Sequence, residues 1–169
     1  MALLTIDATI AVKFLVEEGG SKEARTFFPK LTDAGYIAKH SLIAPVLMML
    51  EAHHALAKKI RRHEVHPYVL SRAYPHLKQF IKFNVVDQDL VEEARRISMT
   101  GKARSVGVMP IYPSEFSIFN IYDCVYVAHA MQTNSTLVTS DAELARIARD
   151  GFSVSVEFVD SKVVGNRLP

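Results

Sequence analysis

Four acidic side chains fall beside the ends of predicted strands or near the starts of predicted helices: Asp7, Glu51, Asp123 and Asp141. Carboxylates gathered at one place repel one another unless protons or cations compensate their charge. Oxygen-only ligand sets suit hard divalent metals, chiefly Mg²⁺ or Mn²⁺. A metal of this kind activates water and stabilises the charge that develops on a phosphodiester. The four residues therefore suggest metal-dependent phosphodiester hydrolysis, provided that the fold brings them together.

A predicted helix, a buried strand and a second helix position two of these acids. Asn120 is a good N-cap for an apolar helix over 121–131, and Asp123 falls at its N3 position. The β-branched run Thr136–Thr139 has the composition of a buried strand. Asp141 follows that strand and opens another amphipathic helix. Each of the two acids has a capping explanation when it is taken alone.

The other two acids lie in the first third of the chain. The apolar run Leu3–Ile6 predicts a strand that ends at Asp7, where a helix begins. A helix is predicted from Pro45 to about Arg62, with Glu51 directly after five apolar residues. Burial of an unpaired carboxylate costs several kcal/mol. Capping does not explain Glu51, so its position indicates a functional role rather than a structural one.

Strands alternate with helices along the rest of the chain. Further helices are predicted over 22–31, over 67–79 with a kink at Pro75, and after Asp87; further strands are predicted over 37–44, 81–86 and 154–159. This alternation predicts an α/β sandwich around a mainly parallel sheet, built as a single domain over 1–160 with a polar tail at 161–169. Sites in such sheets form outside the carboxyl ends of the strands. We expect the four acids to meet at that edge.

The bulk composition is that of an ordinary folded protein. The 169 residues are 49% hydrophobic and 22% charged, with a formal net charge of +2. This mild positive charge does not by itself indicate nucleic acid binding. Cys124 is the single cysteine, which excludes an intramolecular disulfide and a cysteine-based zinc site. With no signal peptide or membrane-length apolar run, the expectation is a soluble cytoplasmic protein without a membrane partner.

The motifs around the four acids resemble those of the PIN domain family, and within it the stand-alone VapC-like ribonucleases. The matching pieces are Ile6–Thr9, Ala44–Pro45 leading to Glu51, Tyr122–Ala128 and Leu137–Asp141. The resemblance implies a three-layer α/β/α sandwich and an endoribonuclease that depends on Mg²⁺ or Mn²⁺. It also implies that the four acids bind the metal, with Thr9 and Ser140 as supporting hydroxyls. An antitoxin protein of a VapBC-type toxin–antitoxin pair and a homodimer are the partners that follow from it, besides the RNA substrate.

Two features depart from the family pattern. The predicted loop over 101–119 is longer than the one that compact members carry before the Tyr-Asp motif. Its Lys102 and Arg104 could bind the phosphate backbone of RNA, and its aromatic side chains could either stack on bases or pin the loop to the core. Glu143 stands where many relatives carry a further acid, and its role is left open.

Several of these residues also fit roles other than metal binding. All four acids could be structural, and a non-catalytic RNA- or protein-binding PIN module regulated by a partner is the alternative function. The Glu-x-x-His pattern that ends at His54 would need a second copy to build a di-iron site, and the sequence has none. Cys124 is better explained as a small buried residue than as a nucleophile. His129 is predicted to lie at the surface or the core edge. A haloacid-dehalogenase-type phosphatase is rejected, because Thr9 occupies the place of its second Asp.

Overall fold

The computed structural model of the protein describes residues 2–16, 40–100 and 119–159. Its strands form one sheet in the order β3-β2-β1-β4-β5, and each strand pairing is parallel. The strands are β1 (Ala2–Ile6), β2 (His40–Pro45), β3 (Ile81–Asn84), β4 (Thr136–Thr139) and β5 (Val156–Phe158). In the central pairings Leu4 lies opposite Leu42 on one side and Thr136 on the other. The predicted mainly parallel sheet is confirmed.

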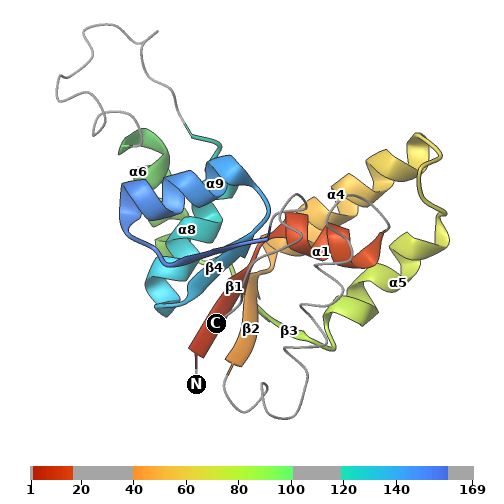
Figure 1. Ribbon diagram of the computed structural model, residues 1–169, viewed down its shortest axis with the longest axis horizontal. Coiled ribbons are helices and arrows are strands. Elements are labelled where there is room, and N and C mark those ends of the chain that lie inside the picture. The colour runs from red at the N-terminus through yellow and green to blue at the C-terminus, as the bar shows by residue number, and fades with distance from the viewer. Residues whose placement is uncertain (1, 17–39, 101–118, 160–169) are drawn as a thin grey trace, which may run out of the picture.

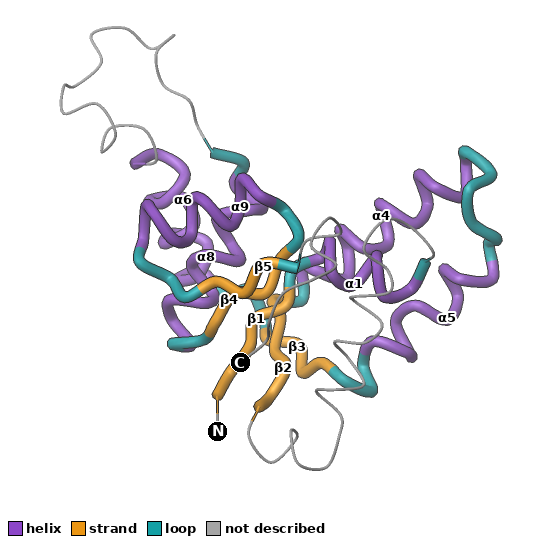
Figure 2. Tube along the Cα trace, viewed as in Figure 1, coloured by secondary structure: helices purple, strands orange, loops and turns teal. Residues whose placement is uncertain are grey.

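Two groups of helices cover the sheet and complete the predicted three-layer sandwich (Figure 1). One group consists of α1 (Ala8–Leu15), α4 (Leu47–Arg61) and α5 (Tyr68–Leu77). The other consists of α6 (Gln88–Thr100), α8 (Ile121–Thr133) and α9 (Ala142–Arg146). Figure 2 shows the strands between these two groups, with β1 near the middle. The fold class predicted from strand–helix alternation is therefore correct.

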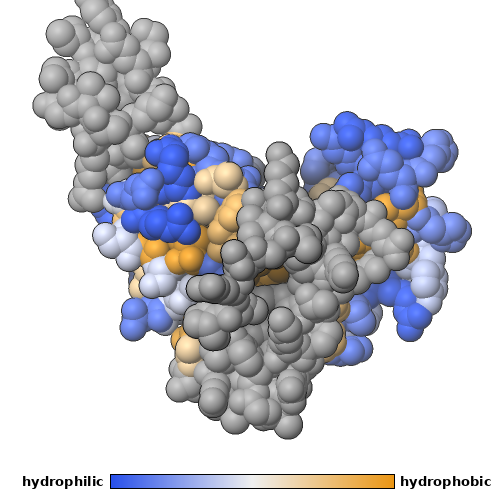
Figure 3. Space-filling model, in the orientation of Figure 1, coloured by the Kyte–Doolittle hydropathy of each residue, from blue (hydrophilic) through white to orange (hydrophobic). Residues whose placement is uncertain are grey.

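The core lies on both faces of the sheet. Helix α8 is buried from Cys124 to Ala130, as expected for a helix that is apolar all round. A second apolar cluster, which includes Val12, Leu56 and Ala73, joins α1, α4 and α5. The outer ends of the two helix groups carry hydrophilic side chains in the space-filling view (Figure 3). Asp123 is thus anchored on a helix whose middle is buried in the core.

Several element boundaries differ from those predicted. Pro45 is the last residue of β2 rather than the first of a helix, and α4 begins two residues later. Pro75 lies inside α5 without splitting it; it lacks the N–H that would bond to the carbonyl of Ser71, a residue that is exposed to water. Helix α9 continues as a π-helix over Ile147–Gly151. The predicted helix at 22–31, most of the 101–119 loop and the 161–169 tail lie outside the described residues.

None of the helices within the described ranges is both long and apolar enough to cross a membrane.

Candidate active site

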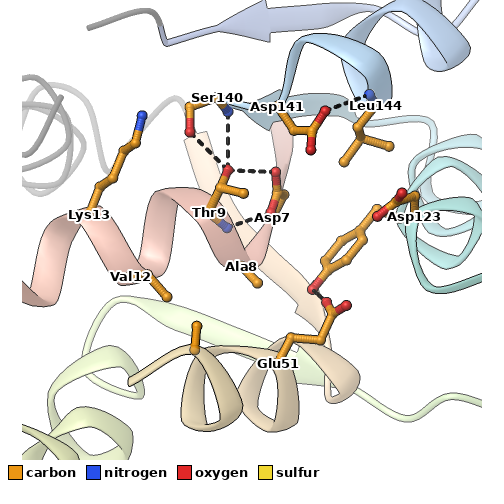
Figure 4. Close-up of a pocket in the computed structure, with 12 residues that line it drawn as sticks. Asp7, Ala8, Thr9, Val12, Lys13, Glu51, Asp123, Ser140, Asp141 and Leu144 are labelled. Carbon is orange, nitrogen blue, oxygen red and sulfur yellow. Dashed lines mark hydrogen bonds between the residues drawn. The ribbon is translucent and has the colours of Figure 1, made fainter. Parts of the chain in front are cut away.

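The four predicted acids line one pocket of about 420 Å³, where β1 and β4 end and their helices begin (Figure 4). Asp7 follows β1 and Asp141 follows β4. Glu51 reaches the pocket from the second turn of α4, and Asp123 from the first turn of α8. Thr9 and Ser140 also line the pocket. The sequence-predicted residues thus come from four distant segments to one edge of the sheet.

Asp7 is the most enclosed of the four acids, with 3% of its surface exposed. Its Oδ1 accepts a hydrogen bond of 2.6 Å from the Thr9 backbone N–H, which caps α1. Its Oδ2 accepts hydrogen bonds from the Thr9 hydroxyl at 2.8 Å and from the Thr139 hydroxyl. Burial nevertheless raises the pKa of Asp7 to about 6, and the nearby Asp141 charge adds to the effect. The carboxylate is rigidly held but electrostatically uncompensated.

The Thr9 hydroxyl joins the two strand ends. It donates to Asp7 and accepts from Ser140 twice, at 3.2 Å from the backbone N–H and at 3.0 Å from the hydroxyl. These bonds tie the start of α1 to the segment that leads into α9, as Figure 4 shows. Thr9 and Ser140 therefore lie beside the acids; Thr9 orients Asp7 directly, and Ser140 acts through Thr9.

Asp141 is an N-cap, as the sequence suggested. Its Oδ1 accepts from the backbone N–H groups of Glu143 at 2.8 Å and Leu144 at 3.0 Å. Its own N–H donates to the Thr139 hydroxyl at 2.9 Å. Both capping bonds use one oxygen, and within the described ranges the other carboxylate oxygen accepts no hydrogen bond, which leaves it for a ligand in the pocket.

Asp123 has no capping role in the structure. The cap of α8 is Asn120, whose side chain accepts from the Tyr122 N–H at 3.1 Å. Across the described part of the chain, no donor forms a hydrogen bond with the Asp123 carboxylate. Burial and the charges of Asp141, Glu51 and Asp7 together raise the pKa of Asp123 to about 6. Capping thus explains Asp7 and Asp141 but not Asp123.

Glu51 is held by a residue whose polar role the sequence analysis missed. The Tyr126 hydroxyl donates a hydrogen bond to Glu51 Oε2, across 75 positions of sequence. Burial raises the pKa of Glu51, and this hydrogen bond opposes the rise. Tyr126 lies one turn after Asp123 on α8, and that spacing is the signal by which it could have been found.

Lys13 is a second pocket residue that was not predicted. It lies one turn after Thr9 on α1, so the two side chains share a face of the helix. Among the residues that the structure describes, Lys13 forms no ion pair. A cation in this position, beside four acids, is suited to a negatively charged group of a ligand.

The pocket offers oxygen ligands of the kind that hard divalent metals prefer. The uncompensated Asp123 carboxylate and the second oxygen of Asp141 both fit such an ion. The pocket is not pre-assembled, however: over residues 2–16, 40–100 and 119–159, no three acidic, histidine or cysteine side chains are close enough to form a metal-binding group. The four residues share a pocket, and a bound ion would have to draw their side chains closer together.

The remaining sequence-based expectations have mixed outcomes. Lys102 and Arg104 lie outside the described residues. Phe119, at the end of the predicted loop, is 8% exposed, so it packs in the core and does not stack on bases. Glu143 forms an exposed ion pair with Arg146 at 2.7 Å. Cys124 is fully buried, as predicted, and burial raises the pKa of its thiol to about 12.

The sequence over residues 4–150 matches the PIN domain family. The chain belongs to the PIN domain family. The resemblance seen in the four acidic motifs is thereby confirmed. A search of curated proteins finds no match.

Solved structures share the PIN fold at low sequence identity. The structure of VapBC2 from Rickettsia felis, bound to a DNA fragment from its promoter, is 12% identical with a TM-score of 0.61, and the match covers 94% of this chain and 99% of that one. VapBC-1 from Haemophilus influenzae is 12% identical with a TM-score of 0.57, over 92% and 97% of the two chains. VapC20 from Mycobacterium tuberculosis, a toxin that cleaves the sarcin-ricin loop, is 10% identical with a TM-score of 0.54, over 83% and 92%.

Proposed function

We propose that this PIN domain is a metal-dependent endoribonuclease and the toxin of a VapBC-type toxin–antitoxin pair. The observation that carries the proposal is the Asp123 carboxylate, which is partly buried and faces three other acids with no donor among the described residues. An arrangement of this kind destabilises the protein by itself, because like charges repel in a poorly solvated site. A cation bound by the pocket would remove that cost.

Asp7, Glu51, Asp123 and Asp141 would hold the Mg²⁺ or Mn²⁺ ion. Bound there, the metal supplies an activated water and charge stabilisation at the scissile phosphate. Asp7 and Asp141 are fixed by their hydrogen bonds to Thr9 and Glu143, so they define the rigid side of the site. The hydroxyls of Thr9 and Thr139 keep the Asp7 carboxylate oriented, and the Ser140 hydroxyl holds Thr9 in place.

Lys13 would bind a phosphate of the substrate backbone next to the reacting one. Its ammonium group lies on the rim that α1 contributes, and Figure 4 shows it on the Ser140 side of the pocket. A charged contact of this kind adds affinity without reading sequence. Lys102 and Arg104 are proposed to extend the same backbone contact outside the described structure.

The substrate class and the partners rest on the relatives. VapC20 is described as a toxin that cleaves the sarcin-ricin loop, and the VapBC structures contain the two components together. RNA and an antitoxin protein are therefore the proposed partners. A homodimer is proposed as well, because Val46, just before α4, is 45% exposed and the first third of the sequence carries further apolar residues, among them Phe27, Phe28 and Met49. Sedimentation that gave only a species of 18.9 kDa would contradict the dimer.

The test is a metal titration combined with a cleavage assay. The purified chain should bind Mn²⁺ in isothermal calorimetry and should cut single-stranded RNA only when Mg²⁺ or Mn²⁺ is present. A DNA strand of the same sequence is the control for substrate class. Metal binding with no cleavage of any RNA would contradict the enzyme assignment.

A non-catalytic PIN module regulated by a partner is the second candidate. The observation that favours it is the absence, within the described ranges, of three acids already close enough to bind one metal. This candidate predicts that RNA binding and partner binding are unaffected by Mn²⁺. The same metal titration therefore separates the two functions.

A further inference from the structure

We propose that Tyr126 is a positioning residue that sets the Glu51 carboxylate for metal binding. This inference rests on the proposed function, because it assigns a role within the same pocket. It concerns a residue that touches the acids rather than the metal or the substrate.

The Tyr126 hydroxyl is buried among the acids. The side chain is 1% exposed, although a phenol carries a polar group that needs hydrogen-bond partners. The hydroxyl donates to Glu51 Oε2, and the backbone N–H of Ala8 lies beside it. The proton of the hydroxyl is thus used in a hydrogen bond to one carboxylate.

This bond and the neighbouring Ala8 N–H bring together the elements that carry three of the acids. Ala8 directly follows Asp7 at the start of α1, and Glu51 projects from α4. Tyr126 itself lies three positions after Asp123 on α8, so the two side chains share a face of that helix. A single hydroxyl therefore couples the position of Glu51 to the segments that hold Asp7 and Asp123.

Glu51 needs this support more than Asp7 and Asp141 do. Asp7 and Asp141 accept backbone N–H groups of their own helices, which fixes their short side chains. Glu51 stands in the second turn of α4, past the N–H groups that a carboxylate can cap, and its side chain is longer. The Tyr126 hydroxyl occupies only Oε2, so Oε1 is left to turn toward a cation. Without the hydroxyl, Glu51 would have to be ordered by the metal itself, at a cost in affinity.

The decisive experiment measures Mn²⁺ binding, not only activity. Tyr126→Phe keeps the ring and removes the hydroxyl, and its affinity for Mn²⁺ in calorimetry should fall by about 10-fold or more. Tyr122→Phe is the matched control, because Tyr122 lies on the same helix one turn earlier and is 53% exposed. The control should bind Mn²⁺ as the wild type does.

A double-mutant cycle separates positioning from packing. In a Glu51→Gln background the Tyr126→Phe change should cause no further loss of Mn²⁺ affinity, because the carboxylate that it positions is gone. A purely structural tyrosine would weaken binding equally in both backgrounds, and that result would overturn the proposal. Folded Tyr126→Phe protein that binds Mn²⁺ like the wild type would overturn it as well.

The wild-type chain gives an independent measurement if Tyr126→Phe does not fold. In an NMR titration with Mg²⁺, the Tyr126 ring carbon that bears the hydroxyl should shift together with the Glu51 carboxyl carbon. Shifts at the aspartates without a shift at Tyr126 would refute the role. Failure of the wild type to bind Mn²⁺ or Mg²⁺ at all removes the proposed function along with it, whereas normal wild-type binding with an unaffected Tyr126→Phe variant removes this inference alone.

Discussion

Two polar clusters lie beside each other, each with a residue at the end of β1 or just after it and a residue on α8, and they are built in opposite ways. The acidic pocket uses Asp7 and Asp123. The histidine network, which lies deeper along the same strand and helix, uses Thr5 and His129 together with Asn84, Ser135 and Thr133. Both clusters place polar groups among apolar neighbours. In the histidine network hydrogen-bond donors face acceptors, whereas in the acidic pocket acceptors face one another.

Every polar side chain of the histidine network has a partner. His129 Nδ1 lies 2.9 Å from the Thr5 hydroxyl, and its Nε2 lies 3.0 Å from the Asn84 amide nitrogen. The Thr5 hydroxyl also forms a hydrogen bond of 2.6 Å with the Ser135 hydroxyl, and the Thr133 hydroxyl donates to the His129 carbonyl at 2.7 Å. Burial lowers the pKa of His129 to about 4, so the ring is neutral at pH 7. The sequence-based placement of His129 at the surface or core edge is therefore wrong.

The acidic pocket contains an excess of acceptors, by contrast. Asp123 and Glu51 face Asp7 and Asp141 with few donors between them, and burial with mutual repulsion raises the pKa of Asp7 and Asp123 to about 6. A network in which donors face acceptors stabilises the fold by itself. A cluster with an excess of acceptors lowers stability until a ligand completes it. This difference separates a structural cluster from a functional one. Mutations in the first should lower stability, and mutations in the second should lower activity.

Asp123→Asn should have the largest effect, and it should be on activity alone. Loss of a proposed metal ligand should lower RNA cleavage by about a hundredfold or more, while the melting temperature of metal-free protein stays equal or rises. Cleavage assays and thermal melts test the two halves. Asp89→Asn, an exposed acid in the first turn of α6, is the control. Severe destabilisation by Asp123→Asn would place this residue with the structural cluster.

His129→Leu should act in the opposite sense. The change leaves the buried Thr5 hydroxyl and the Asn84 amide without their contacts to the ring, and we expect the free energy of unfolding to fall by about 2–4 kcal/mol. Urea titrations give this value, and Mn²⁺ affinity of the folded variant should be unchanged. Loss of metal binding without loss of stability would show that the two clusters are not distinct.

The pH dependence of stability should show opposite signs for the two clusters. The folded protein holds a proton on Asp7 up to about pH 6, because the pKa lies above its ordinary value of 3.8, so this group lowers stability as pH rises through that window. Asp7→Asn should therefore be neutral below pH 4 and stabilising by about 3 kcal/mol at pH 7 in metal-free protein.

His129 reverses the sign, because its folded pKa of about 4 lies below the ordinary value of 6.5. Its unfolded form takes up a proton as pH falls from 6.5 toward 4, and wild-type stability is lost there. The cost of His129→Leu should accordingly shrink by about 3 kcal/mol over that range. Unfolding titrations of both variants at about pH 4, 5, 6 and 7 provide the comparison. If the free energy of unfolding changed with pH in the same way for both variants and the wild type, the protonation behaviour expected of Asp7 and His129 would be contradicted.

Lys13→Met should have the smallest effect, limited to substrate binding. Loss of one contact to the RNA backbone should raise KM for RNA severalfold, with kcat and Mn²⁺ affinity unchanged. The slope of the logarithm of the binding constant against the logarithm of the salt concentration should fall by the contribution of about one phosphate contact. Steady-state kinetics at several salt concentrations measure this. Lys58→Met, on an exposed part of α4, is the matched control. Equal KM values for the two variants would exclude Lys13 from the site.

The sequence by itself determined the features that are encoded locally. Apolar and β-branched runs located the strands, Asn120 and Asp141 marked helix starts, and the alternation of elements required a parallel sheet. Because parallel strands deliver their carboxyl ends to one edge, the positions of Asp7 and Asp141 in the pocket followed as well.

Only the tertiary structure decided which polar groups have hydrogen-bond partners. The sequence allows a capping role for both Asp123 and Asp141, yet the Asp141 carboxylate caps its helix and the Asp123 carboxylate accepts no bond from the described residues. The Tyr126–Glu51 bond spans 75 positions, and the contact between His129 and Thr5 spans 124. Such pairs depend on how helices pack across a sheet, which side-chain periodicity within one element does not specify.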